Sequence, residues 1–228
     1  MLTDLIKKKS QYGKEWQNSS PEFYQKLYDR CPLHHENFLE YFKSKSDVFS
    51  ILEIGCGTGI YSIKFKELFS EKKYTGFDIS ESAINYCENH SNFEFICDDF
   101  IKRELNKKFD MVFSHAVIDH VYDIDSFLSK IVKTCRKYAY VSSYRGYFPN
   151  LEKHNTFWIN EESCYYNDLS VSQIEQTLLD SGLSKDEFVL RPQETGQKKR
   201  KISNFEFKMN IARDLSIELV IEITKKDI

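Results

Sequence analysis

Three glycines spaced two residues apart, Gly55, Gly57 and Gly59, follow a hydrophobic run that ends at Ile54. A strand that enters a helix through such a turn lets a ligand approach the backbone closely and offers it the N–H groups of the helix N-terminus. The third glycine comes one residue earlier than in the G-x-G-x-x-G turn of dinucleotide-binding proteins. The spacing therefore predicts a ligand-binding turn and counts against a dinucleotide oxidoreductase, with a purely structural tight turn as the alternative.

Acidic residues follow the next two predicted strands. Asp78 stands 19 residues after Gly59, where a carboxylate can bind both hydroxyls of a ribose. Its alternative role is a favourable charge at the N-terminus of the helix that Ser80 opens. Asp98, Asp99 and Phe100 follow the next strand and place an acid beside an aromatic ring, a combination that suits an adenine base.

Candidate acid–base groups gather after the strand predicted for 111–114: His115, Asp119, His120 and Asp123. Folds of parallel strands place their chemistry at the carboxyl ends of the strands. His120, with Asp119 beside it, is the preferred general base, because an imidazole titrates near ~6.5, close to working pH. A positioning role for His120 is the alternative. Histidines and aspartates could also hold a divalent cation, but their spacing is not diagnostic and no metal site is predicted.

The segment 143–168 is too long and too aromatic for a plain connection, and long loops of this kind often bind substrates. Arg145 would suit a phosphate or carboxylate group. The alternative is that the aromatic rings only pack the segment onto the domain. The residues predicted to contact a substrate are Tyr144, Arg145, His154, Trp158, Tyr165 and Tyr166.

Short apolar runs alternate with helical patterns through the middle of the chain. Strands are predicted for 48–54, 74–77, 93–97, 111–114 and 138–142, with helices over 58–69, from Ser80 onward and over 124–135. This alternation predicts a parallel sheet covered by helices on both faces. Helices are also expected from Ser20-Pro21, over 34–42, and after the capping box Ser170–Gln173 up to Gly182. The runs 205–211 and 215–224 predict a terminal antiparallel hairpin.

Length and composition set wider limits. The chain of 228 residues is 41% hydrophobic and 29% charged, which indicates a soluble globular protein, and its net charge of −3 counts against a nucleic-acid partner. The six cysteines show no C-x-x-C spacing, and we find no signal peptide or long apolar run. We therefore expect a cytoplasmic protein without a membrane partner. The oligomeric state stays open.

Four motifs in order, "LEIGCGTG", "GFDIS", "ICDDF" and "FDMVFSHAVIDHV", resemble those of class I S-adenosylmethionine-dependent methyltransferases over 48–142. The resemblance implies an α/β, Rossmann-like methyltransferase fold with a mostly parallel seven-stranded sheet, helices on both faces and a C-terminal antiparallel hairpin. It also implies S-adenosyl-L-methionine as the cofactor. We expect one domain over 1–228, with a helical cover (1–45), a cofactor-binding core (46–142), a substrate lid (143–169) and a C-terminal helix and strands (170–228).

The resemblance also assigns roles to residues. The glycines would contact the methionine moiety and ribose, Asp78 the ribose hydroxyls, Asp98 and Phe100 the adenine. Ser114 and His115 would line the methionine side. The complete set of expected cofactor-binding residues is Glu53, Gly55, Cys56, Gly57, Gly59, Asp78, Ile79, Asp98, Asp99, Phe100, Ser114 and His115.

The expected activity is methyl transfer to a small polar acceptor, at a hydroxyl oxygen of a sugar or of a phosphorylated or carboxylated metabolite. Methylation of nitrogen on a small molecule and an inactive cofactor-binding partner subunit are the alternatives. A nucleic-acid methyltransferase is disfavoured, since the place after the fourth strand reads "SHAVIDH" and lacks the N-P-P-Y-like stretch of base N-methylating enzymes.

Overall fold

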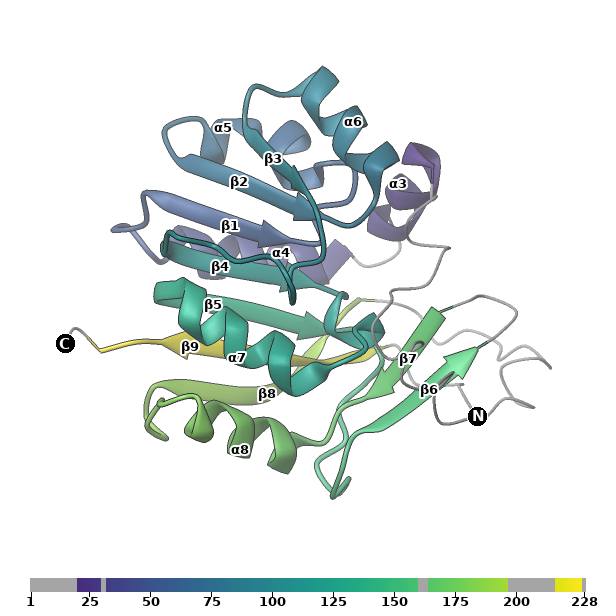
Figure 1. Ribbon diagram of the computed structural model, residues 1–228, viewed down its shortest axis with the longest axis vertical. Helices are drawn as coiled ribbons and strands as arrows, with labels where there is room; N and C mark the ends of the chain where they lie inside the picture. The colour runs from purple at the N-terminus through teal and green to yellow at the C-terminus, as the bar shows by residue number, and fades with distance from the viewer. Residues whose placement is uncertain (1–19, 30–31, 160–163, 197–215, 227–228) are drawn as a thin grey trace.

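A seven-stranded sheet with helices on both faces forms the body of the protein (Figure 1). The structure, a computed structural model, describes residues 20–29, 32–159, 164–196 and 216–226. The strands lie in the order β3-β2-β1-β4-β5-β9-β8. Their bounds are β1 Ser50–Ile54, β2 Lys73–Asp78, β3 Glu94–Cys97, β4 Phe109–His115, β5 Cys135–Ser143, β8 Phe188–Glu194 and β9 Ile217–Thr224.

The direction of the strands confirms the predicted fold class. β1 pairs in parallel with β2 and β4, β2 with β3, and β4 with β5, while β9 runs antiparallel to both of its neighbours, β5 and β8. The carboxyl ends of β1, β2, β3, β4 and β5 therefore meet at one edge of the sheet, the edge at which such sheets bind ligands.

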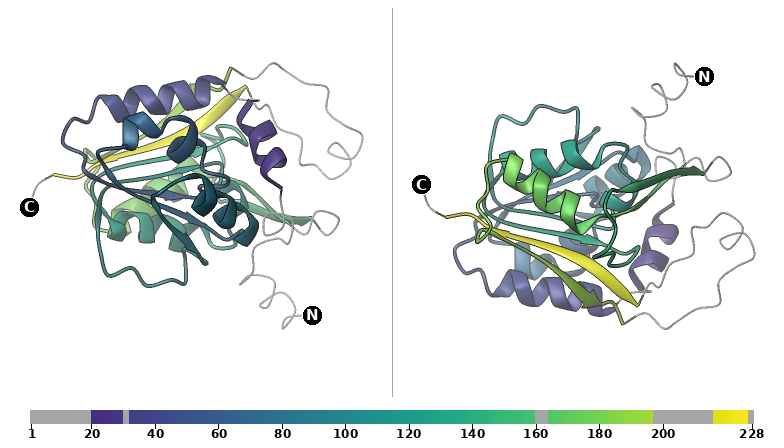
Figure 2. Two further views of the ribbon diagram at one scale, coloured as in Figure 1. Left: turned by 90° about the horizontal axis from the view of Figure 1, so that it is seen from above. Right: turned by 90° about the horizontal axis from the view of Figure 1, so that it is seen from below.

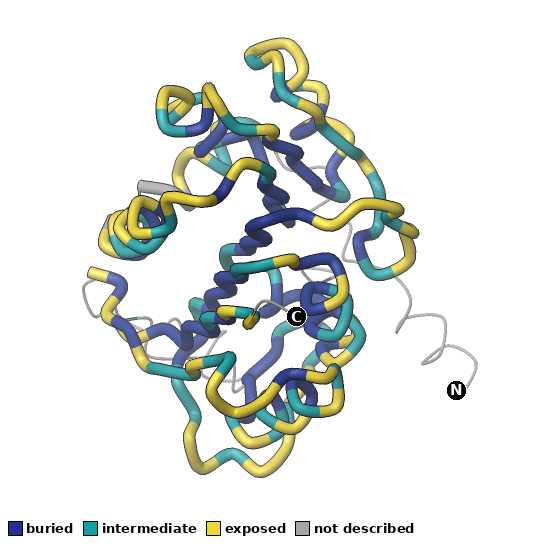
Figure 3. Tube along the Cα trace, turned by 90° about the vertical axis from the view of Figure 1, so that its left-hand side faces the viewer, coloured by how far each residue is buried: buried dark blue, intermediate teal, exposed yellow. Residues whose placement is uncertain are grey.

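Two apolar clusters cover the two faces of the sheet. Helix α4 (Pro32–Lys43) and the short α5 (Lys66–Phe69) bury Phe38 and Phe69 on one face, whereas α7 (Ile124–Thr134) and α8 (Val171–Asp180) cover the other (Figure 2). Figure 3 shows the strands as a buried band between partly exposed helices. Burial of this apolar surface is the main driving force that holds the layers together.

Helix termini follow the predicted capping residues. The Ser80 and Ser170 hydroxyls accept hydrogen bonds from Ala83 N (3.3 Å) and Gln173 N (3.2 Å) at the starts of α6 (Glu81–His90) and α8. Gly182 takes φ +94° just after α8, the left-handed conformation expected of a glycine at a helix end. Asp123, considered above as a candidate acid, accepts from Ser126 N (3.0 Å) and so caps α7.

The helix predicted over 58–69 differs in form. It begins as a π-helical turn, η1 (Ile60–Lys64), and continues as α5 after Phe65, whose φ of −109° interrupts the regular helix. A π-turn accommodates one extra residue. This wider turn brings Tyr61 and Phe69 into the same apolar cluster, with ring centroids 6.3 Å apart.

The C-terminal antiparallel pair is present, and within the described residues it consists of β8 and β9. β9 pairs with β8, from Phe188 opposite Ile223 to Glu194 opposite Ile217, and on its other edge with β5. Both edges of β9 are thus occupied. The predicted first strand, 205–211, lies outside the described residues.

The predicted substrate lid contains a β-hairpin that the sequence analysis did not anticipate. β6 (Asn155–Ile159) and β7 (Cys164–Asp168) form a separate antiparallel sheet, in which Trp158 faces Tyr165 across the strands. Aromatic cross-strand pairs of this kind stabilise hairpins. The hairpin crosses the carboxyl edge of the main sheet in Figure 1.

No helix in the described ranges combines the length and the apolar character that crossing a membrane would require.

Candidate active site

The glycine turn after β1 has the geometry that the sequence predicts. Gly55, Gly57 and Gly59 all have positive φ, at +76°, +50° and +72°. Only glycine adopts such angles without strain. A Cβ atom on Gly55 would lie 2.1 Å from the Val117 side chain, so the loop after β4 lies directly on the turn. The backbone of this turn is accordingly open to close approach by other groups.

Asp78 lies at the end of β2 and faces the glycine turn. Its carboxylate accepts hydrogen bonds from Gly57 N and Ser80 N, both at 2.8 Å. Burial raises the pKa of Asp78, and the backbone N–H groups of Ser80 and Gly57 oppose that rise. The carboxylate therefore fixes the turn and stands at the carboxyl edge of the sheet, where a ribose-binding group was expected.

Helix α3 (Pro21–Asp29) covers this turn through Tyr24. A Cβ atom on Gly57 would lie 2.8 Å from the Tyr24 ring. Burial raises the pKa of Tyr24, with a further increase from the nearby Asp78 carboxylate. Tyr24 was not among the predicted site residues, and no pattern in the sequence marks it.

The acidic pair after β3 and the following ring have different surroundings. Asp98 is partly exposed and forms an ion pair with Arg103 (3.2 Å). The Asp99 carboxylate accepts from the Tyr122 hydroxyl at 2.9 Å. Phe100 is 3% exposed and its ring packs on Phe77 and Phe127. The ring belongs to the core, where little of its face remains for a base.

Other predicted cofactor residues lie next to the glycine turn, at or near the ends of the strands. Glu53 is buried and accepts from the Tyr74 hydroxyl, and burial raises its pKa well above the ordinary value. The Cys56 thiol donates to Gly57 O at 3.8 Å, and Ser114 Oγ donates to Ile54 O at 2.9 Å. The carbonyl of Ile79, which follows Asp78 directly, accepts from a cysteine thiol at 3.8 Å. Glu53, Cys56 and Ser114 are thus bound to the protein's own groups, and they organise the strand ends.

Asp119 and His120 lie on a short 3-10 turn, η2 (Ile118–His120), between β4 and α7. Asp119 is fully buried and accepts from Ser143 Oγ (2.5 Å), Tyr144 N (3.2 Å) and Arg145 N (3.3 Å), which fixes the turn after β5. Burial raises the pKa of Asp119 to about 6, against the opposing effect of the Ser143 hydrogen bond.

His120 connects η2 to the hairpin. Its Nδ1 lies 2.6 Å from Tyr165 O, and a carbonyl can only accept, so Nδ1 carries the proton. Its Nε2 then accepts from the Tyr144 hydroxyl at 3.2 Å. Burial lowers the pKa of His120 to about 3. Both ring nitrogens are engaged within the protein, an arrangement typical of a positioning residue.

Five of the six predicted substrate residues, all except His154, lie in or next to the β6–β7 hairpin. Arg145 is buried, and its guanidinium binds Asp168 at 2.8 Å and stacks over the Tyr166 ring at 4.9 Å. Tyr166 also meets the His120 ring edge to face. Trp158 packs on Tyr165. These contacts attach the hairpin to the ends of β4 and β5.

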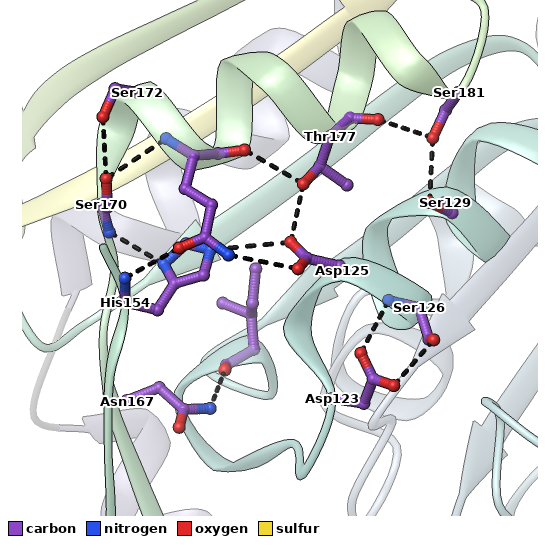
Figure 4. A network of polar contacts seen from close by, with 12 residues as sticks. Asp123, Asp125, Ser126, Ser129, His154, Asn167, Ser170, Ser172, Thr177 and Ser181 are labelled. Atoms are coloured by element: carbon purple, nitrogen blue, oxygen red, sulfur yellow. Dashed lines mark hydrogen bonds and ion pairs between the residues drawn. The ribbon is translucent and has the colours of Figure 1, made fainter. Parts of the chain in front are cut away.

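His154 lies in a different place, in the polar network between α7 and α8 (Figure 4). Its Nδ1 accepts from Ser170 N at 2.9 Å, and its backbone N donates to the Gln173 side chain at 3.0 Å. Asp125 lies 3.8 Å from Nε2. The side chain therefore holds the start of α8, apart from the tyrosines with which it was grouped.

A cluster that the sequence analysis missed surrounds His115. The His115 ring lies 4.5 Å from His34, 6.0 Å from His35 and 5.3 Å from Tyr61, measured between centroids. His34 Nδ1 contacts the Glu218 carboxylate, which is fully buried. The adjacent pair His34-His35 at a predicted helix start was visible, but no pattern in one sequence links it to a residue 184 positions away.

Histidine, cysteine, aspartate and glutamate are the residue types that bind metal ions in proteins. Within the described residues, no set of three or more histidine, cysteine, aspartate or glutamate side chains has an arrangement that could hold a metal ion.

A family model described as a methyltransferase domain matches residues 45–206, more than half of the chain. Among curated proteins, a malonyl-[acyl-carrier protein] O-methyltransferase of Acetivibrio thermocellus is 34% identical over 97 residues, covering 41% of this chain and 33% of that protein. A second such enzyme, from Ilyobacter polytropus, is 32% identical over 118 residues, covering 45% and 46%. The match thus spans less than half the length of these relatives.

Solved structures share the fold over nearly the whole chain. Magnesium protoporphyrin IX methyltransferase from Synechocystis PCC 6803, solved with bound S-adenosylmethionine, has a TM-score of 0.61 at 13% identity and covers 96% of this chain and 97% of its own. The plantazolicin methyltransferase BpumL, solved with S-adenosylhomocysteine, has a TM-score of 0.60 at 16% identity, covering 99% and 100%. The family match, the order of strands and the geometry of the glycine turn agree, and this chain belongs to the methyltransferase-domain family, as a class I S-adenosylmethionine-dependent methyltransferase.

Proposed function

We propose that this protein transfers the methyl group of S-adenosylmethionine to an oxygen of a small, uncharged polar acceptor bound beneath the β6–β7 hairpin. The observation that carries the acceptor side is the His120–Tyr144 pair. An imidazole with a fixed tautomer holds a half-buried phenol at the carboxyl end of β5, so that one polar group has a defined position under the hairpin.

The residues at the glycine turn fit the cofactor. Glycines with positive φ let it approach the backbone, and the Asp78 carboxylate supplies an acceptor for ribose hydroxyls at the end of β2. Asp98 and the backbone after β3 would hold the adenine, whereas Phe100 would support that segment from the core. When bound, S-adenosylmethionine supplies a methyl group on a positively charged sulfur, and the protein mainly has to orient the acceptor and keep water away.

The hairpin contacts support an uncharged acceptor. Arg145 was the group expected to bind a phosphate or carboxylate, but Asp168 neutralises its buried guanidinium. Breaking that pair to bind an anionic acceptor would leave the Asp168 carboxylate buried without its cation, at a high free-energy cost. Phosphorylated and carboxylated acceptors, which were expected from the sequence, are therefore disfavoured.

The choice of oxygen draws on the relatives. Six of the matched curated proteins bear the name malonyl-[acyl-carrier protein] O-methyltransferase. A ubiquinone biosynthesis O-methyltransferase of Pelagibacter ubique is 26% identical over 148 residues. The six malonyl-[acyl-carrier protein] O-methyltransferases each match less than half of this chain, so they support the type of chemistry without identifying the acceptor.

The decisive experiment is a screen for release of S-adenosylhomocysteine with matched sets of hydroxylated, carboxylated and amino acceptors. We expect turnover with hydroxylated compounds. With the best of them, Tyr144→Phe should lower kcat/KM by about 10-fold, because one hydrogen bond at the acceptor is lost. Affinity for S-adenosylhomocysteine, measured by calorimetry, should not change.

The matched control is Tyr138→Phe, which removes a phenol hydroxyl that β5, the strand preceding Tyr144, donates to Asp47. It should leave kcat/KM unchanged. Turnover with amino acceptors alone would overturn the proposal, as would a Tyr144→Phe variant as active as the unmodified protein.

The position of Tyr24 predicts a gated cofactor site. Because its ring rests on Gly57 beside Asp78, α3 has to shift before a ribose can reach the carboxylate. Tyr24→Ala should therefore raise the association rate of S-adenosylhomocysteine, by about 10-fold if the closed state predominates. Stopped-flow fluorescence measures this rate. Tyr86→Ala, which removes a ring stacked on His90 of α6, is the control. An unchanged association rate with faster dissociation would show instead that Tyr24 packs on the bound cofactor.

A further inference from the structure

A buried chain of polar groups leads from β9 to the end of β4. The Glu218 carboxylate contacts His34 Nδ1, His34 Nε2 lies 3.5 Å from Ser142 Oγ, and Ser142 Oγ lies 3.0 Å from His115 Nδ1. Taking the proposed function as given, we propose that this chain ends in the catalytic base, with His115 Nε2 receiving the proton of the acceptor hydroxyl.

The chain of polar groups ends at His115 Nε2, an atom without a hydrogen-bond partner among the described residues. This atom is also buried. Burying an unpaired nitrogen costs free energy that a hydrogen bond would recover. A hydroxyl group donating to Nε2 would satisfy this atom, and the acceptor proposed above carries such a group.

The hydrogen bonds determine which tautomer His115 adopts when His34 is neutral. Glu218 can only accept, so His34 carries its proton on Nδ1 and its Nε2 accepts from the Ser142 hydroxyl. Ser142 Oγ has then used its proton and accepts from His115 Nδ1–H. His115 Nε2 is left with a lone pair, which is the form a general base needs.

The chain of polar groups can take up the proton that the acceptor hydroxyl loses. As the bond between the acceptor oxygen and the methyl carbon forms, the bond from that carbon to sulfur breaks and its electron pair stays on sulfur. The hydroxyl proton passes to His115 Nε2. His115 Nδ1 gives its proton to Ser142, and Ser142 gives its own to His34 Nε2, which ends as an imidazolium beside the Glu218 carboxylate.

Glu218 is placed to stabilise that imidazolium. Its second oxygen accepts from Gln193 Nε2 at 2.6 Å, so the carboxylate is held in place as well as buried. An opposite charge in contact favours the charged form of a histidine. The 3.5 Å step from Ser142 to His34 is long for a hydrogen bond, and it would have to shorten for transfer.

Other groups around this chain of polar groups disfavour a positive charge or leave it unchanged. His35 from α4 and Lys64 from η1 add positive charge when protonated, whereas Tyr61 from η1 and Tyr140 from β5 are neutral phenols. Burial, then the neighbouring His34 and His35, keep the pKa of His115 well below the ordinary value. Charge on His115 itself is thus unfavourable, and the chain supplies a place for it beside Glu218.

The first test needs no acceptor. In protein labelled with nitrogen-15 at histidine, NMR should show His115 at pH 8 as the neutral tautomer with its proton on Nδ1 and a bare Nε2. In Ser142→Ala this preference should be lost, because the hydroxyl that receives Nδ1–H is gone. A proton on Nε2 of the unmodified protein at pH 8 would overturn the proposal.

The second test uses the hydroxylated acceptor that gives the highest turnover in the screen. His115→Asn should lower kcat by roughly 100-fold, a far larger effect than any change in the affinity for S-adenosylhomocysteine. Ser142→Ala, which removes a single oxygen atom, should lower kcat by about 10-fold and serves if His115→Asn folds poorly. His90→Asn, on the exposed side of α6, is the matched control and should be fully active.

Glu218→Gln separates a base from a structural residue. Without the carboxylate the His34 imidazolium is less stable, so the acidic limb of the kcat profile should move to lower pH while the plateau falls. Equal kcat in His115→Asn and the unmodified protein, or an acidic limb unmoved in Glu218→Gln, would overturn the inference. Failure to bind S-adenosylhomocysteine or to methylate any hydroxylated acceptor would instead reject the proposed function.

Discussion

Replacing Asp78 with alanine is expected to weaken the binding of S-adenosylhomocysteine at least about 100-fold. Hydrogen bonds to a charged group contribute about 1.5–3 kcal/mol each, and in the proposed binding mode a ribose offers two hydroxyls to this carboxylate. The substitution also removes the partner of Gly57 N and Ser80 N, so the glycine turn loses its fixed shape. Titration calorimetry on the purified protein measures the effect directly.

Two further variants define what that loss means. Asp78→Asn keeps the size of the side chain and one acceptor oxygen, and should retain an intermediate affinity. Asp123→Ala removes the cap of α7, so it should lower stability slightly and leave the affinity unchanged. A dissociation constant for Asp78→Ala within threefold of the unmodified protein would show that the ribose is held elsewhere.

The affinity should also depend on pH in a defined direction. In the proposed binding mode the ionised Asp78 carboxylate accepts from both ribose hydroxyls, and burial raises its pKa above the ordinary 3.8. On acidification, binding should therefore begin to weaken at a higher pH than it would with an exposed aspartate.

Arg145→Ala should destabilise the protein by about 3–5 kcal/mol, because it leaves Asp168 buried without its cation. Both side chains of this pair are only 3% exposed, so solvent cannot replace the guanidinium. The stacking of Arg145 on Tyr166 is lost as well. Urea denaturation gives the change in the free energy of unfolding, and the slope of the transition should remain constant.

A comparison pair of charges lies nearer the surface. Arg191 and Glu222 are 38% and 22% exposed, so Arg191→Ala should cost no more than about 1 kcal/mol. Replacing Arg145 and Asp168 together with methionine and leucine should restore most of the stability lost in the single variant, since no charge then remains buried. If Arg145→Ala were as stable as Arg191→Ala, the guanidinium would not be the group that holds the hairpin.

Local patterns predicted most of the fold and the tight glycine turn after β1. Glycine spacing, hydroxyl caps and apolar periodicity act over a few residues, so Gly57, Ser80 and Ser170 could be placed from the sequence. The partner of β9 could not, because the apolar runs compete for the same edge and only the completed sheet selects β8.

The surroundings of Arg145, His154 and His115 were less predictable for a related reason. Arg145 has the charge of an anion-binding residue, but its role depends on Asp168, which lies on the far strand of a hairpin that was not foreseen. His154 has the residue type of a site histidine, but the start of α8 fixes it elsewhere. The cluster around His115 joins α4, β4, β5 and β9, and residue types alone do not show that such distant segments meet.

The place of β9 between β5 and β8 has a consequence for how the chain reaches its native state. A ribosome releases this strand after every other described strand, so a nascent chain carries two unpaired strand edges until it arrives. The His34–Glu218 contact spans 184 positions and forms last as well. Contacts of such high sequence separation slow folding, so the newly made protein should pass through a stage with exposed strand edges, in which chaperones protect it, until β9 is in place.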